Sequence, residues 1–91
     1  MSVLVRIPGP LRSITGGVDK ANVEGGTLGA CIGELEVRFP GIRERMLDEA
    51  GQMRYFVNVY LNGEDVRFLQ GLETPIKTGD ELSIVPAVAG G

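Results

Sequence analysis

One stretch of this chain carries its apolar residues at helical spacing, whereas most of the remaining apolar residues follow the spacing of strands. The stretch follows Gly25-Gly26 and ends at Pro40-Gly41. Its apolar positions are Leu28, Cys31, Ile32, Leu35 and Phe39. Because they recur every three or four residues, they form one stripe on an amphipathic helix, with Thr27 placed as its N-cap. Such a helix must bury its stripe against another layer, and the strands predicted around it supply a sheet.

Alternating apolar residues predict the strands. These are residues 3–7, 18–23, 55–61, 64–68 and 82–85. Asn62-Gly63 supplies the two positive-φ positions of a type I′ hairpin turn, and Pro86 ends the last strand because it has no N–H. Residues 42–47 add a short helical turn in which Arg43 and Arg45 face solvent.

The order of these elements favours a single α+β domain over residues 1–91, with residues 87–91 as a flexible C-terminal tail. Two strands precede the helix and three follow it, without a repeat or a linker. A helix across one face of a mixed sheet of about five strands, whose first and last strands pair, is the β-grasp (ubiquitin-like) arrangement.

The residue types present exclude most catalytic and metal sites. The sequence has no histidine and one cysteine, which removes Ser-His-Asp and Cys-His catalysis, imidazole ligation, an internal disulfide and multi-cysteine zinc sites. Acidic pairs occur at 48–49, 64–65 and 80–81, but each lies beside a turn signal, where carboxylates are normally solvated. Cys31 lies in the helix stripe and is expected to be a buried apolar residue.

Charge and hydropathy indicate a cytoplasmic protein that binds other proteins. A net charge of −3 without a cluster of Lys or Arg argues against nucleic acid and anionic membranes as partners. No run of 18 apolar residues and no signal-peptide pattern occurs.

The sequence ends in Gly90-Gly91, directly after an apolar stretch. Two glycines form the thinnest polypeptide available, able to enter a narrow channel and present a carboxylate. We therefore expect the reactive group to be the C-terminal carboxylate of Gly91, with Gly90 needed for access.

Several segments together resemble the ubiquitin-like sulfur carriers. They are residues 54–62 (Arg-Tyr-Phe-Val-Asn-Val-Tyr-Leu-Asn), 64–68 (Glu-Asp-Val-Arg-Phe), 71–72 (Gly-Leu), 79–80 (Gly-Asp) and 85–91 (Val-Pro-Ala-Val-Ala-Gly-Gly). The family includes the small subunit of molybdopterin synthase, the thiamin-pathway carrier and a carrier that feeds a cysteine synthase. The resemblance covers nearly the whole chain and is closest to the cysteine-pathway branch.

The resemblance implies a carrier rather than an enzyme, although the molybdopterin branch counts as a synthase subunit. An E1-like enzyme would adenylate the Gly91 carboxylate, and sulfur delivery would then give a thiocarboxylate. This chain would bind no cofactor or metal, since it lacks a Walker A loop and the ATP and Mg²⁺ would belong to the activating enzyme. The sulfur acceptor would be a pyridoxal-phosphate cysteine synthase or the large subunit of molybdopterin synthase.

Side chains for partner binding are expected in two places. Phe56 and Tyr60 point to the sheet face opposite Val57 and Val59, and Arg67 and Phe68 on the next strand extend this patch. An overlying loop or dimerisation are alternative uses of the patch. The second group consists of Pro86, at the end of the last strand, and of Val88 and Ala89 in the tail.

Two other functions fit the same residues. In a protein modifier the activated Gly91 would instead form an isopeptide bond with a lysine. In a plain β-grasp interaction module the terminal glycines would be incidental, and removing them would change nothing.

Overall fold

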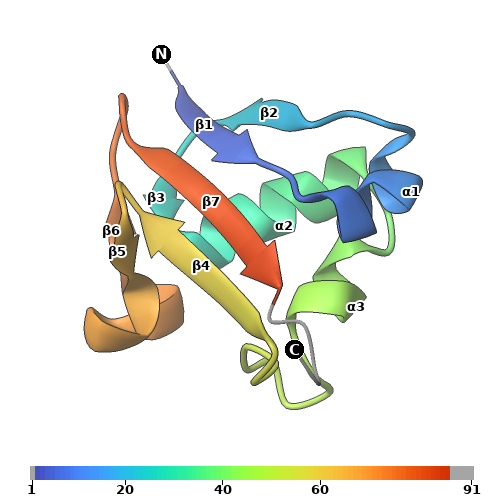
Figure 1. Cartoon of the computed structure of the whole chain (residues 1–91). Helices are drawn as coiled ribbons and strands as arrows, with labels where there is room; N and C mark the ends of the chain where they lie inside the picture. Colours follow the sequence, from blue (N-terminus) through green and yellow to red (C-terminus); the bar gives the residue numbers. More distant parts are fainter. Residues whose placement is uncertain (1, 87–91) are drawn as a thin grey trace.

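A computed structural model describes residues 2–86 and shows a mixed five-stranded sheet packed on one main helix (Figure 1). The strand order is β2 (Lys20–Val23), β1 (Val3–Arg6), β7 (Glu81–Pro86), β4 (Val57–Leu61) and β5 (Glu64–Asp65). The first and last strands of the chain, β1 and β7, pair in parallel at the centre, and the other pairs are antiparallel. Strands β3 (Gly26–Thr27) and β6 (Pro75–Ile76) form a separate pair. The predicted β-grasp fold is confirmed.

The main helix, α2 (Leu28–Arg38), begins and packs as its sequence predicts. The Thr27 side chain accepts a hydrogen bond from the Ala30 amide at 3.1 Å. Four residues of its stripe, Leu28, Cys31, Ile32 and Leu35, are buried under the sheet, and Phe39 at the C-cap is half-buried. Complete burial of one large apolar side chain stabilises the fold by about 1.5–3 kcal/mol. The predicted helical turn is α3 (Ile42–Met46), in which Arg43 and Arg45 are exposed and Met46 is buried.

The core lies between α2 and one face of the sheet. Alternate residues of the central strands enter it, as in β1, where Val3 and Val5 are buried and Arg6 is exposed. No helix lies in front of the other face of the sheet in Figure 1. This arrangement leaves the outward-facing side chains of β1, β7 and β4 at the surface among the residues described.

Short helical turns occur in segments for which no helix was predicted. Residues 9–15 form η1 (Gly9–Leu11) and α1 (Arg12–Thr15), which the sequence analysis did not predict, and Gly16 closes α1 with φ 69°. A further turn, η3 (Gly71–Glu73), lies before β6, between the predicted strands 64–68 and 82–85. Three or four residues are too few to display a helical period, so the pattern could not reveal these turns.

The hairpin turn is confirmed, but both strands of that hairpin are shorter than predicted. Asn62 and Gly63 have φ angles of 50° and 89°, as a type I′ turn requires. The return strand stops at Asp65, whose carboxylate accepts the Arg67 amide at 2.8 Å and caps η2 (Val66–Phe68). Residues 55–56 form a turn before β4. At the other end, β7 extends through Pro86, whereas the predicted strand ended at Val85.

Candidate functional site

The last strand delivers the chain to one end of the sheet, beside the start of β4. Pro86, the last residue described, lies opposite Val57, and Val85 lies opposite Asn58. The predicted reactive residue Gly91 lies outside the described residues, as do Gly90, Ala89 and Val88. Pro86 therefore marks where the predicted tail leaves the part of the fold that is described.

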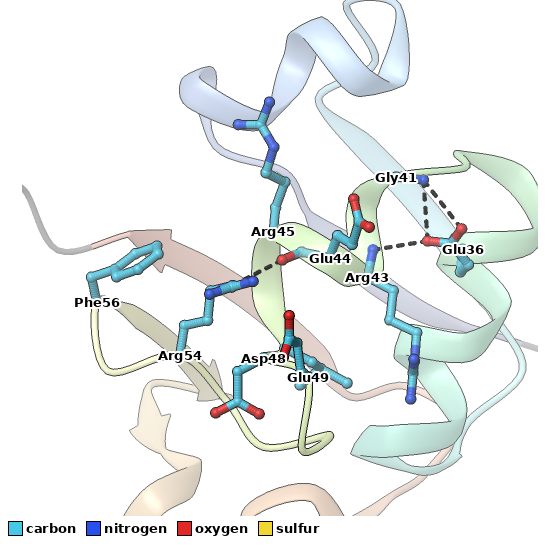
Figure 2. A pocket seen from close by; sticks show the side chains of 10 residues that line it. Glu36, Gly41, Arg43, Glu44, Arg45, Asp48, Glu49, Arg54 and Phe56 are labelled. Carbon is cyan, nitrogen blue, oxygen red and sulfur yellow. Dashed lines mark hydrogen bonds between the residues drawn. The ribbon is translucent and has the colours of Figure 1, made fainter.

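A hollow of about 840 Å³ opens beside this exit, between α3, the turn after it and the residues that lead into β4 (Figure 2). It is lined by Glu36, Gly41, Arg43, Glu44, Arg45, Leu47, Asp48, Glu49, Arg54 and Phe56. Figure 2 shows Phe56 and Arg54 on the side nearest the end of β7, and Glu36 on the opposite side. The hollow thus combines one aromatic wall with charges of both signs.

Arg54 connects the segments around the hollow through hydrogen bonds. Its Nε–H donates to the carbonyl oxygen of Glu44 at 2.8 Å, and its backbone N–H donates to the carbonyl of Met46 at 2.9 Å. Its own carbonyl accepts a bond from the guanidinium of Arg67 at 2.7 Å. Arg54 therefore connects α3, the start of β4 and η2, and it fixes the turn that carries Phe56.

Backbone amides hold two carboxylates of the hollow. Glu36 accepts from the amides of Gly41 and Arg43, and these bonds hold its pKa below the ordinary value. Asp48 accepts from the amides of Ala50 and Gln52 at 2.9 and 3.0 Å. Both carboxylates shape the loops around the hollow through ordinary turn contacts.

The four residues of the predicted patch come from three elements instead of two neighbouring strands. Tyr60 is on the outward face of β4, as predicted, and is half-buried. Phe56 lies in the preceding turn with 37% exposure and packs edge-to-face on Tyr55. Arg67 and Phe68 lie in η2, so their placement on a strand was wrong; the aspartate cap at Asp65 turns the chain into a helical turn there.

Arg67 makes intramolecular bonds that the sequence did not reveal. Its guanidinium donates to Asn58 Oδ1 at 2.6 Å as well as to the Arg54 carbonyl, so it braces the edge of β4. Phe68 is 84% exposed, so its side chain is accessible to a partner. The partner-binding roles of Phe56, Tyr60, Arg67, Phe68 and Pro86 stay predictions.

Two residues beside the exit were not among the predicted site residues. Arg54 lines the hollow, and Tyr55 is 89% exposed. Arg54 directly precedes the alternating run predicted over residues 55–61, and Tyr55 begins it, so their place at a strand entrance was the available signal. Their position at the point where β7 ends could not be read from the sequence, because it depends on the pairing register.

Other titratable groups serve the fold. The Asp80 carboxylate accepts from the Lys77 amide at 2.8 Å and from the Asn62 side chain at 3.1 Å, which lowers its pKa and closes the predicted turn. Among residues 2–86, no cluster of three or more His, Cys, Asp or Glu side chains is arranged to hold a metal. Over the same range, no helix is long and apolar enough to cross a membrane.

Cys31 is expected to resist alkylation while the protein is folded. It is buried in α2, and burial, followed by the charge of Glu34, raises the pKa of its thiol to about 11. At pH 8 the thiol is therefore protonated and covered, and only the thiolate reacts readily. Iodoacetamide labelling followed by mass spectrometry should show modification in denaturant and almost none without it. Rapid labelling of the folded protein would contradict the assignment of Cys31 to the core.

Comparisons with known proteins agree with the fold and with the sequence resemblance. Residues 5–91 match the model of the ThiS family. The chain is 50% identical over 93 residues to sulfur carrier protein CysO of Mycobacterium tuberculosis, with all of both chains covered. It is 37% identical over 65 residues to small archaeal modifier protein 3 of Haloferax volcanii, covering 71% of this chain and 70% of that protein.

A solved structure shows that the similarity extends to the fold. The fold superposes on a chain in the crystal structure of the Amycolatopsis orientalis BexX/CysO complex with a TM-score of 0.92 and 47% identity, covering 98% of this chain and 99% of that one. With a family match through residue 91 and a relative of 50% identity over its full length, the chain belongs to the ThiS family of ubiquitin-like sulfur carriers.

Proposed function

We propose that this protein carries sulfur as a thiocarboxylate on Gly91 and donates it in a biosynthetic pathway. The observation that carries the proposal is the 50% identity to a sulfur carrier protein over the full length of both chains. The described part of β7 supports it, because the strand carries the chain to Pro86, at one end of the sheet beside the start of β4.

The chemistry begins at a carboxylate, which is a poor electrophile. A carboxylate oxygen of Gly91 attacks the α-phosphorus of ATP in the activating enzyme, and pyrophosphate leaves. A sulfur donor then replaces AMP at the carbonyl carbon and produces the thiocarboxylate. The activating enzyme supplies the ATP and Mg²⁺ sites, and the carrier supplies a chain thin enough to reach the reacting centre and a surface to be recognised.

Two enzymes are the proposed partners, both in the cytoplasm. One is an E1-like adenylating enzyme, and the other is an enzyme that takes up the sulfur. The acceptor that we favour is a pyridoxal-phosphate cysteine synthase, in line with the similarity to CysO; the large subunit of molybdopterin synthase is the alternative. A complex of a related chain with a second protein, BexX/CysO, supports the idea that the fold docks on protein partners.

A second function, protein modification, has one observation in its favour. The similarity to small archaeal modifier protein 3 covers 71% of this chain. Activation would be the same in both cases, and only the acceptor would differ, an amine of another protein in place of a sulfur donor.

Intact-mass spectrometry of the protein isolated from its own cells separates the two functions. A carrier is expected to gain the mass difference of one oxygen replaced by sulfur, and the gain should disappear when the activating enzyme is deleted. A modifier should instead appear in adducts of higher mass that resist thiol reagents. Absence of the sulfur-containing species under conditions of active sulfur assimilation would overturn the proposal.

Replacing Gly90 with Val is expected to slow adenylation by roughly tenfold or more, because a β-branched side chain widens the tail and restricts its backbone. ATP–pyrophosphate exchange with the activating enzyme measures the effect. Val18→Thr, a change at an exposed position before β2, serves as the control and should leave the rate unchanged. An unchanged rate for Gly90→Val would show that the tail is not enclosed during activation.

A further inference from the structure

The turn between β4 and β5 is attached to the start of β7 by the side chain of Asn62. Its Nδ2 donates to Asp80 Oδ1 at 3.1 Å, and its Oδ1 accepts from the Glu81 amide at 2.9 Å. The Asn62 backbone N–H also donates to the Glu81 carbonyl at 2.9 Å. We call the two side-chain contacts the Asn62 latch. Together with the backbone bond, they fix the position of this side chain relative to β7.

Asp80, the acceptor of the latch, is itself held in place. Its carboxylate accepts from the Lys77 amide at 2.8 Å, and its backbone carbonyl accepts from the Leu4 amide at 3.1 Å. The Lys77 bond, followed by the contact with Asn62, lowers the pKa of Asp80, so the acceptor is ionised at neutral pH. Hydrogen bonds to an ionised acceptor are stronger than bonds between neutral groups. The latch therefore joins Asn62 to a fixed and charged partner.

The next residue provides a nucleophile for the Asn62 side chain. Gly63 is exposed, and a Cβ placed on it would meet no atom within 4 Å. Within the part of the chain that the structure describes, its amide donates no hydrogen bond. In an Asn-Gly pair the glycine nitrogen can attack Cγ of the asparagine, because glycine has no side chain to block the approach. The latch opposes this attack, because it holds both polar atoms of the Asn62 side chain on β7.

We propose that Asn62 is a deamidation site that the latch keeps closed in the folded protein. When the latch opens, the Gly63 nitrogen forms a bond with Asn62 Cγ. The bond from Cγ to Nδ2 breaks, and the NH₂ group leaves as ammonia with the proton of the Gly63 amide. Water then adds to either carbonyl of the resulting five-membered imide and leaves aspartate or isoaspartate at this position. The net change replaces NH₂ by OH, with water as the co-reactant.

The product cannot restore the latch. A carboxylate at position 62 has no N–H to donate to Asp80, and two like charges at this distance repel each other. In the isoaspartate product the backbone passes through the side-chain carbons, so the two-residue turn gains one atom and loses its type I′ geometry. Deamidation is therefore expected to loosen the end of the β4–β7 pair at which Leu61 lies opposite Leu82. This consequence does not depend on the carrier function.

The test follows deamidation of the full chain by peptide mapping with mass spectrometry at mildly alkaline pH. At Asn62 the folded parent should react more slowly than the same protein in denaturant by about tenfold or more, because ring closure must first open the latch. Asn22 and Asn58 serve as internal controls. Each is followed by a valine, whose branched side chain hinders the attack, and each should react slowly in both states.

Removing the acceptor of the latch should speed the reaction. Asp80→Ala is expected to accelerate deamidation of Asn62 in the folded protein by roughly threefold or more, the effect of losing one hydrogen bond. Asp48→Ala is the matched control. It removes another carboxylate that accepts from two turn amides, in the loop before β4, and should leave the rate at Asn62 unchanged.

A milder variant covers the case in which Asp80→Ala does not fold. Asp80→Asn keeps the shape of the side chain but has one acceptor oxygen in place of two, so it should give a smaller acceleration in the same direction. Amide spectra establish that each variant is folded. The proposal is overturned if Asn62 reacts as fast in the folded parent as in denaturant, or if the folded Asp80 variants accelerate the reaction no more than Asp48→Ala does.

Discussion

Deleting Gly91 is expected to abolish ATP-dependent activation of this protein while leaving its thermal stability unchanged. The reacting carboxylate would then sit on Gly90, one residue short of the position that the activating enzyme must reach, and misplacement of a reacting group by about 1 Å can already cost roughly a hundredfold. The core lies within the described range, between α2 and the sheet. Loss of Gly91 removes no core contact, so the melting temperature should not change. ATP–pyrophosphate exchange and a thermal melt measure the two effects.

Extending the chain by one alanine after Gly91 is the matched control for length. It keeps every native residue but moves the carboxylate in the opposite direction, and it should fail equally. The extended variant also tests whether a protease removes the added alanine and exposes Gly91 again. Such trimming would restore both the activity and the mass of the parent protein. An extended protein that is activated as fast as the parent, with its added residue still in place, would refute a carboxyl-terminal carrier.

The elements that the sequence predicted correctly are those with several turns or alternations to display a period. The stripe of α2 extends over three turns, and its cap at Thr27 and stop at Pro40-Gly41 are both local signals. The turn at Asn62-Gly63 was predictable for a different reason, because a two-residue hairpin demands positive φ at both positions. The pairing of β1 with β7 was predicted from their apolar character as part of the β-grasp arrangement, and the structure adds that the pairing is parallel.

The elements that the sequence missed depend on contacts made at a distance. Residues 66–68 alternate like a strand, but the Asp65 cap and the bonds from Arg67 to Asn58 and Arg54 hold η2 beside β4. The same dependence explains the site. Gly91 and Gly90 could be proposed from position and residue type alone, whereas the place of the hollow beside the end of β7 depends on the register that sets Pro86 opposite Val57.

The two faces of β4 are expected to respond in opposite ways to substitution. Val57 is 3% exposed and faces the core, so Val57→Ser should lower the free energy of unfolding by about 2–4 kcal/mol through a cavity and a buried hydroxyl. Val85→Ser is the matched control. It makes the same chemical change on the adjoining strand, at a position that is 43% exposed, and should cost about 0.5 kcal/mol or less.

Replacing both Phe56 and Tyr60 with Ser should instead weaken binding to the activating enzyme or the sulfur acceptor by a few kcal/mol, the usual order for truncated aromatic anchors. Tyr60 is half-buried on the outward face and Phe56 lies at the exit of β7, so both can reach a partner that receives the tail. Denaturant titrations and binding isotherms on all the variants separate the roles. If the aromatic pair costs mainly stability while Val57→Ser costs mainly binding, the assignment of the two faces is reversed, and the docking surface must then be sought on the side of the sheet that α2 covers.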